Sequence, residues 1–143
     1  MPITIKYGSI FDSSAQVLVC PVNCVGVMGK GLALEFKQRF PEMWTYYKTR
    51  CDAGELEPGS VYFNRNIALF TTKNHWRDAS QIEWIEYGLI ELADCRYSVG
   101  FQSIAIPQLG CGCGGLDWAE VWPLYEKHLG GLDCDVEVWI HEG

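Results

Sequence analysis

Two glycine-rich segments constrain the fold of this sequence most, because each lies between an apolar run and a helical pattern. The first, Asn23–Gly31 (NCVGVMGKG), follows the β-branched run Gln16–Val22, and the second, Leu109–Gly115 (LGCGCGG), follows Phe101–Pro107. Apolar runs of this length are typical of strands buried on both faces. Since the order strand, glycine segment and helix occurs twice, the sequence predicts a mostly parallel sheet with helices on both faces.

The remaining patterns complete an α/β fold class. Further strands are predicted over Ile3–Tyr7, Val61–Phe63, Ile67–Thr71 and Val136–Ile140. Helices are predicted over Leu32–Arg39, from Pro41 to about Arg50, after a capping box of Ser80 and Glu83, and after a second box of Asp117 and Glu120. The polar turn Asn64–Asn66 joins two of the strands as a hairpin, which would make the sheet mixed.

Composition limits the classes of protein. The 143 residues are 48% hydrophobic, enough for one sizeable core, so we expect a single domain over residues 1–143. A net charge of −7 argues against broad electrostatic binding of a nucleic-acid backbone. The N-terminal segment lacks a secretory apolar region, and no apolar run approaches the ~20 residues that span a bilayer. We therefore expect a soluble, cytoplasmic protein with reduced thiols, no membrane contact and a monomeric state.

The glycine segments are candidates for a diphosphate-binding cleft. They occupy the carboxyl ends of predicted strands, where open α/β sheets bind ligands and where helix N-termini present free N–H groups to anions. The known nucleotide fingerprints do not fit, however. A P-loop would need glycine at Cys24 and a hydroxyl at Gly31, and Gly26-Val27-Met28 breaks the dinucleotide pattern.

A metal site is the next alternative. Cys20, Cys24, Cys111 and Cys113 would converge if the two glycine segments faced each other. Zinc ligands are usually separated by two to four residues, so Cys-x-Cys is cramped, and small buried cysteines are the more common arrangement. The sequence therefore predicts no metal and no cofactor.

Lys73 lies in a polar segment, Thr71–Arg77, directly after an apolar strand. From the residues alone, a solvated loop with ordinary charges is the favoured interpretation. The alternative places Lys73 on the same rim as the glycine segments, where a neutral amine could act as a nucleophile. We interpret His75 as structural and Asp117 as a helix N-cap in preference to acid–base groups.

These residues together resemble the macro domain family, specifically its branch of ADP-ribosyl glycohydrolases. The matching segments are GSIF (8–11), VLVCPVNCVGVMGKGLALEFKQRFP (17–41), LFTTKNHWR (69–77) and SIAIPQLGCGCGGLDW (103–118). Macro domains of DarG-type DNA ADP-ribosyl glycohydrolases resemble the sequence more than the terminal ADP-ribose protein glycohydrolases do. The resemblance implies a three-layer α/β/α macro fold with ADP-ribose in a cleft at the carboxyl side of the strands.

The resemblance also implies roles for individual positions. Ser9 and Ile10 would lie near the adenine, the first glycine segment near a phosphate and the distal ribose, and the second around the diphosphate. Lys73 matches the lysine that this branch is thought to use against the anomeric carbon. The candidate ligand-binding residues are Ser9, Ile10, Asn23, Val27, Met28, Gly29, Lys30, Gly31, Leu32, Thr72, Leu109, Gly110, Cys111, Gly112, Cys113, Gly114, Gly115 and Leu116.

The sequence departs from the family pattern at three positions. Ser9 replaces the aspartate that usually holds the adenine amine, Cys20 replaces the first signature asparagine, and Gly114 aligns with the acid of the protein glycohydrolases. The function implied is removal of ADP-ribose from a modified macromolecule, with DNA bases favoured over protein carboxylates. Two alternatives remain open: a module that binds ADP-ribose without turnover, and a phosphatase or deacetylase of free ADP-ribose derivatives.

Overall fold

Six strands form one mixed sheet in the computed structural model, which describes residues 3–141. The strands are β1 (Ile3–Tyr7), β2 (Val17–Asn23), β3 (Val61–Asn64), β4 (Ile67–Lys73), β5 (Ser103–Pro107) and β6 (Asp135–Ile140). Their order across the sheet is β1-β6-β5-β2-β4-β3. All neighbours pair in parallel except β3 and β4, which form the antiparallel hairpin. The predicted mixed, mostly parallel sheet is confirmed.

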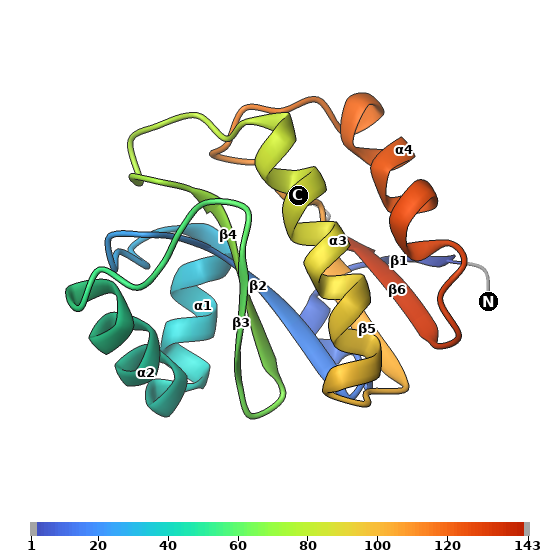
Figure 1. Cartoon of the computed structure of the whole chain (residues 1–143), viewed down its shortest axis with the longest axis horizontal. Coiled ribbons are helices and arrows are strands. Elements are labelled where there is room, and N and C mark those ends of the chain that lie inside the picture. Colours follow the sequence, from blue (N-terminus) through green and yellow to red (C-terminus); the bar gives the residue numbers. More distant parts are fainter. Residues whose placement is uncertain (1–2, 142–143) are drawn as a thin grey trace.

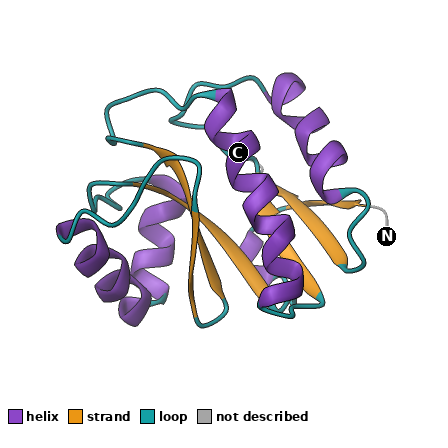
Figure 2. Ribbon diagram, viewed as in Figure 1, coloured by secondary structure: helices purple, strands orange, loops and turns teal. Residues whose placement is uncertain are grey.

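Two pairs of helices cover the sheet, one on each face (Figure 1). The helices are α1 (Gly31–Arg39), α2 (Pro41–Asp52), α3 (Ile82–Ser98) and α4 (Trp118–Leu129), and a short 3₁₀ helix, η1, spans Ile10–Asp12. Figure 2 shows the strands between the α1–α2 pair and the α3–α4 pair. This arrangement confirms the predicted three-layer α/β/α fold.

The central position of β2 in the sheet explains why its sequence is apolar at nearly every position. Val17 and Val19 face the core beneath α3 and α4, whereas Leu18, Cys20 and Val22 face the core beneath α1 and α2. Successive side chains of a strand alternate between the faces of a sheet, so a central strand needs apolar residues on both. The two glycine segments are consequently anchored at the ends of central strands.

The two predicted capping boxes have different outcomes. Asp117 caps α4 as predicted, because its side chain accepts a hydrogen bond from the Ala119 N–H at 3.0 Å. The prediction for Ser80 is wrong, since α3 begins one residue later with Gln81 as its N-cap and no side-chain capping bond. The backbone N–H of Ser80 instead donates to the Gly114 carbonyl at 2.9 Å. Ser80 Oγ is buried and has no hydrogen-bond partner among the described residues, so the side chain caps no helix.

No helix within residues 3–141 combines the length and apolar character needed to cross a bilayer.

All seven cysteines are free thiols.

Gly88 lets α3 lie directly on β4. A Cβ atom at this position would overlap the ring of Phe70, a fully buried residue. Helix propensity alone favours Gly88→Ala by about 1 kcal/mol, but overpacking a core costs about 1–3 kcal/mol. We predict that Gly88→Ala lowers the free energy of unfolding in chemical denaturation. In a Phe70→Leu background the same substitution should cost less, and equal costs in both backgrounds would contradict the contact.

Candidate functional site

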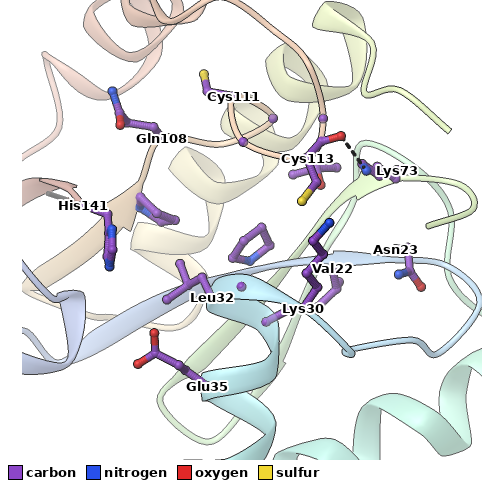
Figure 3. A pocket seen from close by; sticks show the side chains of 18 of the residues that line it. Val22, Asn23, Lys30, Leu32, Glu35, Lys73, Gln108, Cys111, Cys113 and His141 are labelled. Atoms are coloured by element: carbon purple, nitrogen blue, oxygen red, sulfur yellow. Dashed lines mark hydrogen bonds between the residues drawn. The ribbon is translucent and has the colours of Figure 1, made fainter. Parts of the chain in front are cut away.

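A pocket of about 1070 Å³ opens at the carboxyl ends of the central strands (Figure 3). Because β2, β4, β5 and β6 run in parallel, the segments that follow them meet at one edge of the sheet. In Figure 3, Lys73 and Cys113 lie at one end of the pocket, while Gln108 and His141 lie toward the other. This arrangement follows the strand order, in which β4 and β6 lie on opposite sides of β2 and β5.

The first glycine segment is folded around the Asn23 side chain. Oδ1 accepts hydrogen bonds from the Val25 and Val27 N–H groups at 3.1 and 3.3 Å, and Nδ2 donates to the Val27 carbonyl at 2.8 Å. The hydroxyl of Tyr47, from α2, lies 2.8 Å from both Oδ1 and the backbone oxygen of Asn23. Asn23 lines the pocket, but these bonds also make it the clip that shapes residues 25–27.

The first turn of α1 presents backbone donors to the pocket. Its N-cap, Lys30, is extended and makes no side-chain capping bond. Gly31, Leu32 and Ala33 follow, and their N–H groups donate to no other residue within the described part of the chain. Unsatisfied donors at a helix N-terminus, together with the positive end of the helix dipole, form a ready binding site for an anion.

The second glycine segment closes on itself and leaves a further set of donors. The Leu116 N–H donates to Gly110 at 2.9 Å and the Gly115 N–H to Gly112 at 3.2 Å. The N–H groups of Gly112, Cys113 and Gly114, between them, bond to no other residue among 3–141. Any side chain at Gly114 would collide with the Gly110 carbonyl and Ser80 Oγ, whereas Gly112 has open space. The loop can therefore approach an anion closely.

Tyr125 of α4 anchors this loop as Tyr47 anchors the first. Its buried hydroxyl donates to the Pro107 carbonyl at 2.5 Å and accepts from the Leu109 N–H at 2.9 Å. Burial raises the pKa of both tyrosines, so their hydroxyls remain protonated and keep these bonds across the ordinary pH range.

Lys73 lies at the end of β4 and reaches across to the second glycine loop. A register shift between Val22 and Asn23 pairs Asn23 with Lys73 across the two strands. Lys73 Nζ donates to the Cys113 carbonyl at 2.9 Å and to the Trp76 carbonyl at 3.3 Å. The amine is thereby held at the pocket wall by two neutral oxygens and by no carboxylate among the described residues.

The pocket is cationic although the chain is acidic. Lys30, Lys73 and Arg77 line it against one carboxylate, Glu35, while the whole chain has a net charge of −7. Basic side chains together with two sets of backbone donors suit a ligand with neighbouring negative charges, such as a diphosphate.

The cysteines near the pocket do not assemble a metal site. Cys20 and Cys24 pack on the α1–α2 side of the sheet, whereas Cys111 packs on the α3–α4 side. Burial raises the pKa of Cys24 to about 12, and burial with the nearby Asp117 raises that of Cys111 to about 11. Among residues 3–141, no three His, Cys, Asp or Glu side chains cluster closely enough to hold a metal.

The pocket brings together most, but not all, of the residues that the sequence nominated. The nominated residues that line it are Ser9, Ile10, Asn23, Val27, Gly29, Lys30, Gly31, Leu32, Thr72, Lys73, Gly110, Cys111, Gly112, Cys113 and Gly114. Four nominated residues lie outside the lining: Met28, Leu109, Gly115 and Leu116. Met28 and Leu109 are buried in the core, and Leu116 packs against the α3–α4 core.

Sequence reasoning missed a second group of lining residues. They are Gly8, Pro21, Val22, Ala33, Glu35, Trp76, Arg77, Pro107, Gln108, Trp139 and His141. Trp139 lies near the end of β6 and His141 directly follows this strand, which the strand order places beside β5. The signal for Trp76 and Arg77 was their position within the polar segment that follows β4.

Comparison with known proteins places this α/β/α fold and its pocket in a family. The Macro domain model matches residues 19–125, and the chain belongs to the macro domain family. A Mycobacterium tuberculosis protein named DNA ADP-ribosyl glycohydrolase is 42% identical over 127 residues, covering 83% of this chain and 36% of that protein. This chain thus spans little more than a third of that relative's length.

Two solved structures are similar over nearly the whole chain. The macrodomain of Thermus aquaticus DarG is 38% identical with a TM-score of 0.89, and the match covers 99% of this chain and 98% of that one. Thermosipho africanus DarTG, solved in complex with ADP-ribose, is 35% identical with a TM-score of 0.87, covering 96% and 41%.

Tyr125→Phe should weaken the anchor of the second loop. The substitution leaves the Pro107 carbonyl and the Leu109 N–H without their buried partner, which costs about 1–3 kcal/mol. We predict a loss of that size in the free energy of unfolding, measured by chemical denaturation. Tyr87→Phe is the matched control, because Tyr87 is 60% exposed. Equal stabilities of the two variants would show that the hydroxyl of Tyr125 does not stabilise the loop.

Proposed function

We propose that this macro domain binds ADP-ribose and is an ADP-ribosyl glycohydrolase that removes ADP-ribose from DNA bases in preference to protein carboxylates. The names of the similar proteins, DNA ADP-ribosyl glycohydrolase and DarG, support the activity. The chain spans about a third of the Mycobacterium tuberculosis protein, and the pocket itself supplies the support for the reaction and the substrate.

The backbone donors of the two glycine loops would hold the diphosphate. The first turn of α1 offers the N–H groups of Gly31–Ala33, and the second loop offers those of residues 112–114. Ser9 and Ile10 line the pocket as well and are the proposed neighbours of the adenine. Such donors need no reorganisation when the ligand enters, so binding would fix the distal ribose relative to the pocket wall.

Lys73 carries the catalytic proposal because of its hydrogen bonds. A neutral amine has two N–H groups and one lone pair, and the Cys113 and Trp76 carbonyls are sufficient to accept both N–H groups. The lone pair would then remain available for a carbon electrophile.

The proposed reaction begins with attack of Lys73 Nζ on the anomeric carbon of the distal ribose. A C–N bond to lysine forms, the bond to the DNA base breaks, and the base nitrogen keeps the electron pair and takes the proton released by the amine. Opening of the sugar ring then gives an imine on Lys73, with the former ring oxygen protonated. Addition of water cleaves the imine, restores the amine and releases ADP-ribose, so the step needs no oxidant or reductant.

Lys73→Ala should lower turnover by at least ~10³-fold, the scale of deleting a catalytic group. Lys73→Arg should be nearly as inactive, since a guanidinium remains protonated and is no nucleophile. The measurement is the release of free ADP-ribose from ADP-ribosylated single-stranded DNA and from ADP-ribosylated protein. Lys127→Ala is the control, because Lys127 pairs with Glu86 on α3, away from the pocket.

Borohydride added during turnover should reduce the imine to a stable adduct on Lys73. Substantial activity of Lys73→Arg would favour a water nucleophile with lysine as an electrostatic partner. Full activity of Lys73→Ala would remove the lysine mechanism. If the wild-type protein releases nothing from either substrate but binds ADP-ribose, the chain is a binding module.

Gly112→Glu should abolish ADP-ribose binding without unfolding the protein. Gly112 has open space around its Cβ position and lines the pocket, so the new carboxylate enters the region proposed for the diphosphate. Calorimetry should detect micromolar-range binding by the wild type, about −8 kcal/mol, and none by the variant. Gly131→Glu is the matched control, because Gly131 also has open space but lies outside the pocket. Normal binding by Gly112→Glu would mean that the second loop does not hold the diphosphate.

A further inference from the structure

Three flat side chains form a stack at the pocket wall, on the loop between β4 and α3. The rings of His75 and Trp76 lie with centroids 5.5 Å apart and planes at 30°. The Arg77 guanidinium carbon lies 4.6 Å from the Trp76 ring centroid. Trp76 is 44% exposed, and both Trp76 and Arg77 line the pocket. We call these three residues the stacking cluster.

The cluster is held in place by its own backbone. The Asp78 N–H donates to the His75 carbonyl at 3.0 Å, and the Arg77 N–H bonds to His75 Nδ1 at 3.1 Å. The preceding residue, Asn74, accepts from the Cys24 N–H at 3.0 Å, which ties the loop to the first glycine segment. An exposed aromatic side chain in a fixed turn presents a flat surface at little entropic cost.

The cluster also lies beside the reactive amine of the proposed function. The Trp76 carbonyl is one of the two oxygens that hold Lys73 Nζ. A group attached to the anomeric carbon, when that carbon is next to Lys73, would leave the pocket close to Trp76. Of the exposed large aromatic residues in the described chain, Tyr7, Trp76, Tyr87 and Tyr97, only Trp76 lines the pocket.

We infer that His75, Trp76 and Arg77 are a stacking platform for a nucleobase of single-stranded DNA, and that Trp76 is a specificity-determining residue for DNA over protein. The inference rests on the proposed function and names the feature of the substrate that the site would select. A nucleobase has a π-face that stacks on tryptophan and on a guanidinium, whereas a glutamate or aspartate side chain has none.

Charge favours a single strand over a duplex as the occupant. A chain with a net charge of −7 offers no long basic track for a DNA backbone, but Arg77 supplies one exposed cation beside the aromatic ring. Bases in a duplex are stacked on each other and leave no free face for Trp76, so the platform requires an unstacked base.

The test compares Trp76→Ala with Trp76→Phe on three ligands. These are a single-stranded oligonucleotide with one ADP-ribosylated base, a protein ADP-ribosylated on a carboxylate, and free ADP-ribose. Trp76→Ala should raise KM for the oligonucleotide by about tenfold, the effect of deleting one aromatic stack, with little change in kcat. The ratio of its kcat/KM on the oligonucleotide to its kcat/KM on the modified protein should therefore fall by about tenfold relative to wild type, and Trp76→Phe should retain most of that ratio.

Tyr97→Ala is the matched control. Tyr97 is 74% exposed and has a neighbouring arginine, Arg96, 5.9 Å from its ring, but it lies at the end of α3 and outside the pocket. An equal loss of kcat/KM on DNA and on protein, an equal loss of affinity for the oligonucleotide and for free ADP-ribose, or a change in kcat alone would overturn the inference, because each would assign Trp76 to the pocket or to Lys73 positioning.

Binding measurements separate this inference from the proposed function. If the wild-type protein releases no ADP-ribose from either substrate, the glycohydrolase proposal fails. The platform is still decided by affinity, because wild type should bind the modified oligonucleotide more tightly than free ADP-ribose, and Trp76→Ala should remove that difference. Equal affinities of the wild type for the two ligands would overturn the platform whatever the activity.

Discussion

Two buried tyrosine hydroxyls hold the loops of this pocket in place. The pocket needs such anchors, because its backbone N–H groups must stay free for a ligand and must also keep fixed positions. A loop with free N–H groups is stabilised little by hydrogen bonds within itself, so side chains from neighbouring elements have to fix its conformation. Tyr47 from α2 holds the end of β2, and Tyr125 from α4 holds the end of β5. The two anchors come from opposite layers, so both helix layers contribute to one site.

The position of Lys73 follows from the same parallel pairing. The register shift at the end of β2 brings Lys73 level with Asn23, the residue that clips the first loop. The Lys73 amine then contacts the second loop by donating a hydrogen bond to the Cys113 carbonyl. A change in any of these three contacts would alter the distance between the proposed nucleophile and the backbone donors, which is the quantity that positional catalysis depends on.

Local patterns were sufficient to predict the sheet, the four helices and the two glycine loops at one edge. The repeated order of apolar strand and glycine loop can be recognised from the residues of each segment alone. Tertiary contacts account for the features that local patterns did not predict. Ser80 has the residue type and spacing of an N-cap, but its backbone bonds to Gly114 of a distant loop. Met28 precedes Gly29 in a candidate loop, and its long apolar side chain fills the α1–α2 core outside the pocket lining. Trp139 and His141 reach the pocket only because β6 inserts between β1 and β5, an order that no local pattern specifies.

The contrast between an acidic chain and a cationic pocket explains how a site with few contacts could select its substrate. Lys30 and Arg77 bring positive charge to the pocket against one carboxylate, Glu35, while the whole chain has a net charge of −7. A compact diphosphate would be attracted by the basic side chains and the backbone donors of the pocket. It would experience little repulsion from the acidic surface outside the pocket. An extended polyanion such as a DNA backbone would experience this repulsion along its whole length. Nonspecific affinity for DNA depends mainly on phosphate contacts, which an acidic surface does not favour. On the proposed function, DNA would therefore be held mainly through its ADP-ribose group and the base beside it. Selection for DNA would then depend on the flat side chains at the pocket wall, because the net charge of the chain offers no general attraction.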